Sequence, residues 1–257
     1  MPVPGLEVQS LQRTFDILEV VANSVSPVSL KYITDETGLP KSTVYRLLNN
    51  LEKRDYVKCN SNGSYRLGIQ LLMMSQRAEQ NFDIKHLARK YLVQLNKLTK
   101  ETVHLGILTK HRVLYVDTVE SPHALRLVAK LGTTNSVHCT ALGKALLVEH
   151  DAAIIREFLA IDGMERRTEY TLCTVDAYLA EIAKIRRVGY ALDDCESELD
   201  GRCIGAPIYD NSGQVVAAIS ISGLASRFSK EYIENEVAGK LLESTGEISR
   251  ALGYAGI

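Results

Sequence analysis

The chain has 257 residues, with 30 basic and 31 acidic side chains and a formal net charge of −1, which excludes a polycation that binds nucleic acid through its overall charge. Its five cysteines lack C-x-x-C spacing, which argues against a disulfide framework or a zinc ribbon. The N-terminus lacks the features of a signal peptide, and no apolar run approaches the ~18 residues that span a bilayer. We therefore expect a cytoplasmic protein with no membrane partner and no cofactor, built as two domains because the residue pattern changes near position 80.

The N-terminal segment begins with a helical pattern. Four apolar residues recur at helical spacing: Leu11, Phe15, Leu18 and Ala22. They predict an amphipathic helix over residues 9–23. Ser29 is the expected N-cap of a second, short helix that ends at Gly38, and Pro40 stands near the start of a third helix.

The third helix has two different faces. At about 100° per residue, one stripe is apolar and consists of Val44, Leu47, Leu48 and Leu51. Two short strands, residues 56–59 and 65–67, follow around a turn-rich tip. Six basic and two acidic residues lie between positions 40 and 66, so positive charge is concentrated here. Three helices and a basic hairpin predict a winged helix-turn-helix DNA-binding domain at residues 8–68.

The polar face of the third helix suits the major groove of double-stranded DNA. Ser42 and Thr43 are placed to reach phosphates, Arg46 to recognise a guanine edge and Asn49 an adenine. The hairpin adds groups that follow a phosphate strand. The candidate DNA-binding residues are Lys41, Ser42, Thr43, Tyr45, Arg46, Asn49, Asn62, Ser64 and Arg66. The competing interpretation is an ordinary solvated helix face beside a surface hairpin.

A linker helix is predicted next, at residues 69–82. Its apolar residues have no evident partner inside the small domain, which indicates pairing with a second subunit. Residues 83–254 then show a helix at 84–99, strands at 102–109, 112–120 and 124–130, and helical patterns at 140–160 and 175–188. Strands at 190–193, 202–209 and 215–222 and a helix at 230–252 complete the chain. This order predicts an α+β domain with an antiparallel sheet flanked by helices.

The chain resembles the IclR-type bacterial transcription regulators over residues 8–254. The matching motifs are residues 42–48, 56–57, 63–68, 98–105, 140–146, 202–210 and 219–223. The resemblance implies a winged helix-turn-helix, a linker helix and a GAF-like effector-binding domain. It also implies a homodimer or a dimer of dimers on a palindromic operator, with repression as the commoner outcome. Within the family, the sugar-acid catabolism regulators look most similar.

A ligand pocket is expected in the second domain. Ala141 and Leu142 follow Thr140 at a predicted helix N-terminus, where free N–H groups suit a carboxylate. Ser220 and Ser222 share one face of a strand, and inward hydroxyls need a polar partner. The resemblance implies the full set of effector-binding positions, which is Ala141, Leu142, Asp193, Cys203, Ser220 and Ser222.

We expect the ligand to be a small organic acid, such as a sugar acid or keto acid. The N–H groups and the serines would hold its carboxylate, Asp193 would accept a hydroxyl, and Cys203 would pack beside it. The remainder of the acidic run at 193–200 is expected to be a solvated loop. The competing interpretation of the pocket is two serines satisfied by backbone and an inert, buried cysteine.

Two further functions are conceivable from residue types alone. A catalytic set could be drawn from a cysteine, a histidine and Asp193, with Cys203 or Cys139 as the nucleophile and His138 or His104 as the base. Neither cysteine lies in a nucleophile-elbow context, so we do not predict an enzyme. His138, Cys139, Cys203 and Asp193 could instead hold a metal in a metal-responsive regulator, although their spacing matches no known ligand pattern.

Overall fold

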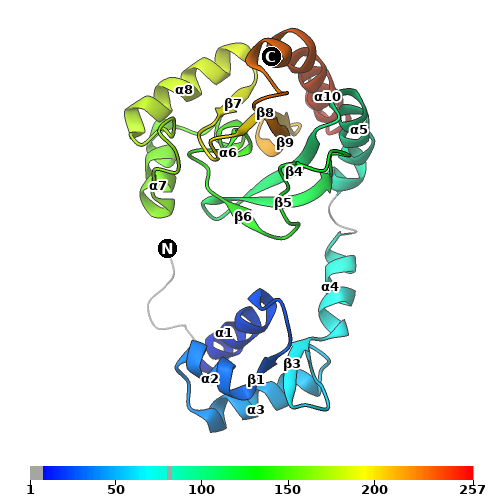
Figure 1. The fold of residues 1–257 in the computed structure, drawn as a ribbon, viewed down its shortest axis with the longest axis vertical. Coiled ribbons are helices and arrows are strands. Elements are labelled where there is room, and N and C mark those ends of the chain that lie inside the picture. The colour runs from blue at the N-terminus through cyan, green and yellow to red at the C-terminus, as the bar shows by residue number, and fades with distance from the viewer. Residues whose placement is uncertain (1–7, 80–82, 257) are drawn as a thin grey trace. The chain divides into compact units, whose positions relative to one another are not determined.

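The computed structural model describes residues 8–79 and 83–256, in two compact units that divide between Phe82 and Asp83 (Figure 1). Residues 80–82, the end of the predicted linker, lie outside the described residues. No helix among the residues described is both long and apolar enough to cross a membrane.

The first unit is a winged helix-turn-helix. Its elements are α1 (Gln9–Asn23), β1 (Val28–Ser29), α2 (Leu30–Thr37), α3 (Lys41–Glu52), β2 (Val57–Cys59), β3 (Ser64–Leu67) and α4 (Ile69–Glu79). The strands form an antiparallel sheet in the order β1-β3-β2. The two-residue strand β1 was not predicted, because it is too short to show an alternating pattern.

Local signals determine the helix ends of this unit. The Ser29 hydroxyl accepts a hydrogen bond from the Tyr32 N–H at 3.2 Å, and Gly38 ends α2 with φ 65°. At Gly68 an added Cβ would lie 2.0 Å from the Asp55 carbonyl oxygen. Only glycine therefore lets the chain pass this close to residue 55 as it enters α4.

The predicted apolar face of α1 is confirmed at Leu18, which packs against the core of this unit, and is wrong at the other three residues. Leu11 and Phe15 are 55% and 54% exposed, and the buried residues of the helix are Ile17 and Val21. Apolar residues cover more than one stripe of α1, so the sequence pattern does not show which stripe faces α2 and α3. By contrast, Val44, Leu48 and Leu51 are buried on α3 as predicted.

The second unit has α+β architecture, as predicted. Its helices are α5 (Asp83–Thr99), α6 (Ala141–Leu146), α7 (Ala152–Asp162), α8 (Val175–Val188), α9 (Lys230–Tyr232), the π-helical turn η1 (Ile233–Val237) and α10 (Ala238–Ala251). Its strands are β4 (Thr102–Thr109), β5 (Arg112–Val119), β6 (Thr134–Asn135), β7 (Ala191–Asp194), β8 (Gly201–Tyr209) and β9 (Val215–Leu224). They form one antiparallel sheet in the order β6-β5-β4-β9-β8-β7.

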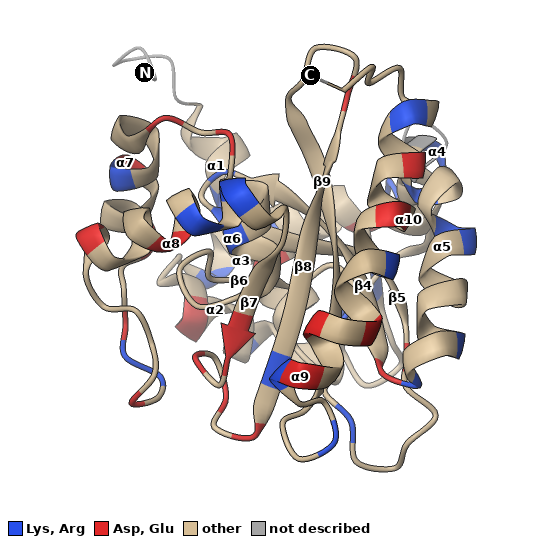
Figure 2. Ribbon diagram, turned by 90° about the horizontal axis from the view of Figure 1, so that it is seen from above, with Lys and Arg blue, Asp and Glu red and all other residues tan. Residues whose placement is uncertain are grey.

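The two faces of this sheet carry different side chains. Val103, Leu105, Ile219 and Ile221 point to one face and join a core cluster with residues of α5 and α10. The other face is covered by α6, α7 and α8 (Figure 2). Side chains alternate along a strand, so His104, between Val103 and Leu105, faces the α6 side of the sheet. Ser220, between Ile219 and Ile221, faces the same side.

Three predicted elements differ from the structure. Residues 124–130 form no strand, because β6 occupies the sheet edge beside β5. The pattern at 140–160 is two helices, α6 and α7, since the chain turns at residues 147–151 and Asp151 occupies the N-cap of α7. The last helix contains the π turn η1 between α9 and α10.

Two glycines bring α6 close to the rest of its unit. A Cβ at Gly205 of β8 would lie 2.8 Å from the Ala141 carbonyl oxygen, and one at Gly143 would lie 2.4 Å from Val137 Cα. Both contacts are shorter than packed atoms tolerate. The absence of a side chain at these positions therefore allows the start of α6 to lie directly against the sheet.

Candidate nucleic-acid interface and ligand pocket

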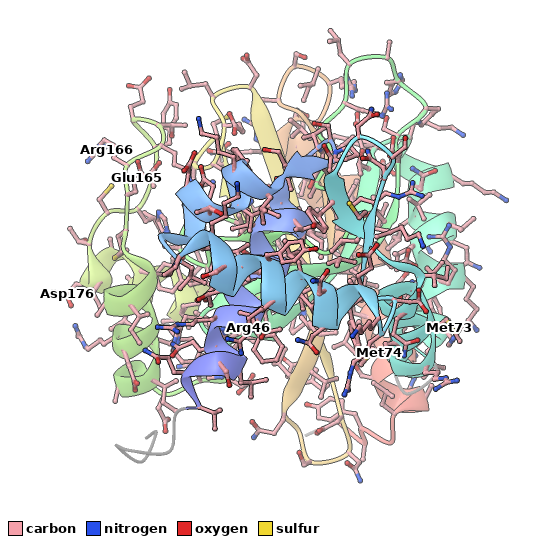
Figure 3. All side chains as sticks on the ribbon, turned by 90° about the horizontal axis from the view of Figure 1, so that it is seen from below. Arg46, Met73, Met74, Glu165, Arg166 and Asp176 are labelled. Carbon is pink, nitrogen blue, oxygen red and sulfur yellow. The ribbon has the colours of Figure 1, made fainter. Side chains whose placement is uncertain are left out.

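The exposed face of α3 carries most of the predicted DNA-binding residues. Lys41, Ser42, Tyr45 and Arg46 are exposed, whereas Thr43 and Asn49 are half-buried beside the packed stripe. Figure 3 labels Arg46 on this helix. The helix therefore presents a fork-shaped cation flanked by short polar groups, which is the chemistry that base edges and phosphates require.

The hairpin β2–β3 carries the other three predicted residues. Asn62 and Arg66 are exposed and Ser64 is half-buried. The Asn60 side chain fixes the tip, since its Oδ1 accepts the N–H groups of Asn62 at 3.0 Å and Ser64 at 2.9 Å. These bonds hold the tip in one conformation.

Lys58 is a basic residue of the hairpin that the predicted set omitted. It lies directly opposite Arg66 in the β2–β3 register, and both side chains are exposed. Like charges in opposed positions destabilise a strand pair unless an anion neutralises them. Pairing a strand residue with its neighbour across the hairpin would have identified Lys58 in the sequence.

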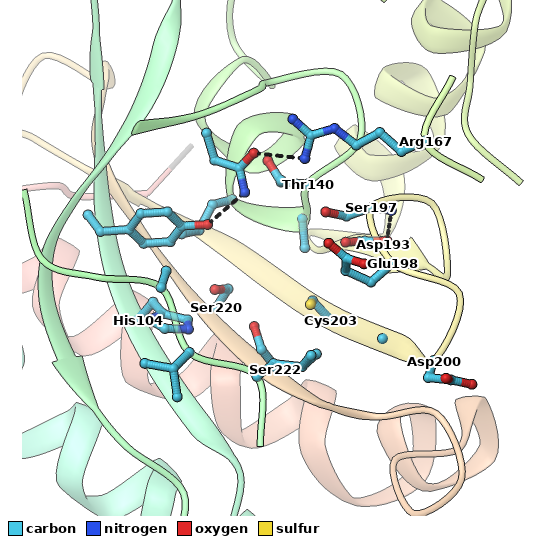
Figure 4. Close-up of a pocket in the computed structure, with 18 of the residues that line it drawn as sticks. His104, Thr140, Arg167, Asp193, Ser197, Glu198, Asp200, Cys203, Ser220 and Ser222 are labelled. Atoms are coloured by element: carbon cyan, nitrogen blue, oxygen red, sulfur yellow. Dashed lines mark hydrogen bonds between the residues drawn. The ribbon is translucent and has the colours of Figure 1, made fainter. Parts of the chain in front are cut away.

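All six predicted effector residues line one cavity of about 630 Å³ in the second unit. Residues of β7, β8 and β9 form one wall of it, and the start of α6 forms another (Figure 4). The structure thus brings together positions that are up to 81 residues apart in the chain, from Ala141 to Ser222.

The strand register places the polar side chains of the wall in rows. Asp193 of β7 pairs with Cys203 of β8, Cys203 with Ser222 of β9, and Ser222 with Thr102 of β4. In the next row on the same face, Gly205 pairs with Ser220, and Ser220 with His104. Hydroxyl, imidazole, thiol and carboxyl groups therefore face the same cavity.

Burial controls the charge of these groups. It raises the pKa of Asp193 to about 7, lowers the pKa of His104 to about 4, and raises the pKa of the Cys203 thiol well above its ordinary value. Near neutral pH the imidazole and the thiol are uncharged. A protonated thiol is a poor nucleophile, so Cys203 does not have the chemistry of a catalytic cysteine.

The start of α6 provides hydrogen-bond donors at the opposite wall. The Thr140 hydroxyl accepts the Gly143 N–H at 3.1 Å and donates to the Ser136 carbonyl at 2.7 Å. The N–H groups of Ala141 and Leu142 precede the first intrahelical bonds, so the helix itself supplies no acceptor for them.

A buried ion pair fixes the loop beside Asp193. Lys144 of α6 is fully buried, donates to the Leu192 carbonyl at 2.8 Å and pairs with the Glu196 carboxylate. The N–H of Glu196 in turn donates to Asp193 Oδ1 at 2.8 Å, and that of Ser197 at 3.2 Å. The prediction of a solvated acidic loop is therefore wrong at Glu196, which is 7% exposed because its charge is neutralised by a residue 52 positions earlier.

Tyr115, Asn135 and Arg167 are among the polar lining residues that escaped prediction, and hydrogen bonds connect them. Asn135 Nδ2 donates to the Tyr115 hydroxyl at 3.3 Å, and Arg167 donates to Asn135 Oδ1 at 3.1 Å. Tyr115 had a detectable signal, since the period of two places it on the buried face of β5 with Val113 and Asp117. Asn135 and Arg167 lie in a two-residue strand and a loop, where no periodic pattern exists.

The predicted metal alternative finds little support in the arrangement of side chains. His138 Nε2 lies 3.0 Å from the Glu165 carbonyl oxygen, and neither His138 nor Cys139 lines the cavity that contains Asp193 and Cys203. Within residues 8–79 and 83–256, no group of three His, Cys, Asp or Glu side chains is placed to hold a metal ion.

Comparisons with known proteins cover nearly the whole chain. The family described as "IclR helix-turn-helix domain" matches residues 10–60, and "Bacterial transcriptional regulator IclR C-terminal" matches residues 76–250. The HTH-type transcriptional regulator KdgR of Escherichia coli is 33% identical over 248 residues, which are 96% of this chain and 94% of that protein. The transcriptional repressor IclR of the same organism is 29% identical over 255 residues, 98% of this chain and 92% of that one. The crystal structure of Thermotoga maritima IclR aligns with a TM-score of 0.79 at 33% identity, covering 96% of this chain and 100% of that one.

Removing one partner of the buried pair should destabilise the second unit. We expect Lys144→Met to lower the free energy of unfolding by about 3–5 kcal/mol, because it leaves the Glu196 carboxyl buried without a cation. Adding Glu196→Met should restore much of this loss. Urea unfolding followed by far-UV circular dichroism measures both. The control is Lys240→Met in the exposed pair Lys240–Glu243, with an expected change within about 1 kcal/mol; an equal loss in Lys144→Met and the control would contradict a structural role for the pair.

Proposed function

Because this chain belongs to the IclR family of bacterial transcriptional regulators, we propose that it is a repressor whose operator binding is controlled by a small organic acid. Family membership makes it a DNA-binding transcription regulator and not an enzyme. The observation that carries the finer proposal is the cavity of about 630 Å³ in which all six predicted effector residues meet.

The polar lining of the cavity favours a ligand with one carboxylate and several hydroxyl or carbonyl groups. The Ser220 and Ser222 hydroxyls and the N–H groups of Ala141 and Leu142 are donors suited to a carboxylate. Asp193 uses Oδ1 for backbone N–H groups, so Oδ2 is the oxygen proposed to meet a ligand hydroxyl, with Cys203 packed beside it. Sugar acids and short keto acids have this chemistry, which agrees with the resemblance to sugar-acid catabolism regulators.

Repression is the direction that the relatives support. The relative with 29% identity over 255 residues is named a transcriptional repressor. A ligand can control operator binding if it binds two conformations of the regulator with different affinities. The resulting change in the free energy of operator binding is at most the difference between those two ligand-binding free energies.

A dimer or tetramer on a palindromic operator is the proposed assembly. Ile69, Leu72, Met73 and Met74 of α4 are all more than 40% exposed, and Figure 3 labels the two methionines on this helix. An apolar helix surface of this kind is typical of a surface that a partner covers. A second copy of α4 would bury it and would set two winged domains on two half-sites.

Two substitutions on α3 should separate sequence recognition from charge attraction. We expect Arg46→Ala to reduce discrimination between operator variants by about 1–3 kcal/mol, because a guanidinium recognises base edges. Lys41→Ala should weaken binding to all sequences alike and lower the slope of log K against log salt by about 1. Fluorescence anisotropy over a salt series measures the discrimination between operator variants and the salt slope. The control is Lys97→Ala of the second unit. An equal loss on every sequence in Arg46→Ala would disprove its role in recognition.

The serines of the pocket should determine ligand affinity. We expect Ser220→Ala combined with Ser222→Ala to weaken the best-binding sugar acid or keto acid by about 10–100-fold, because two hydrogen bonds to the ligand are lost. Isothermal titration of the full chain measures this, and Ser212→Ala, an exposed serine in the β8–β9 turn, is the control. The pocket assignment fails if the double variant binds like the control.

Ligand affinity should also depend on pH through Asp193. Its pKa is raised from 3.8 to about 7, so the folded protein favours the protonated carboxyl. The stability that the protonated form contributes is lost as the pH rises from about 4 to about 7. A ligand carboxylate should therefore bind up to about tenfold more tightly at about pH 6 than at about pH 8, where Asp193 is ionised and repels it. Asp193→Asn should abolish the pH dependence of ligand affinity. If this variant kept the pH profile of the unaltered protein, another group would be responsible for the dependence.

A further inference from the structure

Arg167 is an exposed residue that lines the pocket and has no carboxylate partner within the described part of the chain. The charged side chains that line the cavity are Arg126, Arg167, Asp193, Glu198 and Asp200. Arg126 is neutralised by Glu120, with Nη2 2.8 Å and Nε 3.0 Å from Oε2. Among the side chains that the structure describes, no carboxylate lies within 4.0 Å of the Arg167 guanidinium.

Neutral partners hold this guanidinium in place. Arg167 donates from Nη1 to Asn135 Oδ1 at 3.1 Å and from Nη2 to Ser136 Oγ at 3.3 Å. Asn135 is itself fixed, because its Oδ1 accepts the Ser136 N–H at 2.8 Å and its Nδ2 donates to the Tyr115 hydroxyl. A guanidinium has five N–H donors, so these two bonds leave donors for a further acceptor.

The backbone that carries Arg167 is also fixed. The Arg167 N–H donates to Thr171 Oγ1 at 3.1 Å, and the next residue, Thr168, donates through its hydroxyl to the Cys195 carbonyl at 2.6 Å. The Thr171 hydroxyl donates to the Glu196 carbonyl at 2.7 Å. The loop is thus attached to the segment that follows Asp193, and the guanidinium is positioned before any ligand arrives.

In Figure 4, Arg167 lies near Thr140 on one side of the pocket, and Ser220 and Ser222 lie on the opposite side. Near neutral pH the sheet side offers hydroxyl and thiol groups, a neutral imidazole and the partly ionised Asp193 carboxyl, but no cation. The charge that would balance an acidic ligand therefore has to come from the Arg167 side.

We propose that Arg167 is the specificity-determining residue of the pocket, which selects ligands carrying a carboxylate and rejects their neutral analogues. This inference rests on the proposed function, since it assumes that the cavity binds a small organic acid. The planar guanidinium forms charge-assisted hydrogen bonds with the carboxylate. In this orientation Ser220, Ser222 and His104, on the opposite side, meet the hydroxyl or carbonyl groups of the ligand, and the serines no longer hold its carboxylate.

The test compares acids with neutral amides on two adjacent arginines. Isothermal titration of the full chain uses D-gluconate, D-galactonate, 2-keto-D-gluconate and pyruvate, and the amide of whichever acid binds best. We expect Arg167→Gln to weaken the acid by about 10–100-fold and to leave the amide unchanged, because only the acid loses a charged partner. Arg167→Lys should lose less, since it keeps the charge. Arg166→Gln is the matched control, because Arg166 donates to the Glu169 carbonyl and does not line the cavity.

The outcomes separate this inference from the proposed function. If none of the four acids binds the unaltered protein, the proposed control by an organic acid is wrong, and this inference falls with it. If an acid binds and is weakened by the Ser220 and Ser222 substitutions, but Arg167→Gln binds it as Arg166→Gln does, the pocket assignment stands and the role of Arg167 is wrong. Equal weakening of acid and amide would also overturn that role, because it would indicate loss of structure and not loss of charge recognition. Far-UV circular dichroism of each variant establishes that it is folded.

Discussion

The geometry of the pocket depends on the buried ion pair between Lys144 and Glu196. Lys144 belongs to α6, the helix whose first turn forms one wall of the cavity, and Glu196 follows β7, whose Asp193 belongs to the other wall. The Glu196 N–H also donates to Asp193. One buried contact therefore fixes the distance between the two walls. A buried pair adds little stability compared with apolar residues of the same volume, but it accepts only one arrangement of its partners.

Close backbone packing makes that contact possible. Gly205 and Gly143 let the start of α6 lie against the sheet and against Val137, where any Cβ would overlap backbone atoms. The same sheet sends its branched aliphatic residues to α5 and α10 and its polar residues to the cavity. The cavity side also has an apolar cluster, in which Val113 and Ala218 of the sheet pack with residues of α6, α7 and α8. Apolar cores on both faces of the sheet therefore support the buried polar groups of the pocket.

DNA recognition and ligand recognition rest on different physics in the two units. The first unit gathers positive charge on α3 and on the pair Lys58 and Arg66, although the chain as a whole carries a net charge of −1. The DNA contacts proposed for these residues are exposed, so salt would screen them. In the proposed ligand site Asp193 and His104 are buried, and this burial controls their protonation.

Local signals in the sequence were enough to predict α2, α3, the β2–β3 hairpin and most strands of the second unit, because caps, turns and alternation act over a few residues. The shared face of Ser220 and Ser222 followed from the period of a strand, and the resemblance added Asp193 and Cys203; the role of these residues stays a prediction. Tertiary structure alone decided which stripe of α1 is buried, that Glu196 is inside, and that Arg167 reaches the cavity. Each of these depends on contacts between residues far apart in the chain, as Lys144 and Glu196 are, and no pattern along one segment records what packs against it.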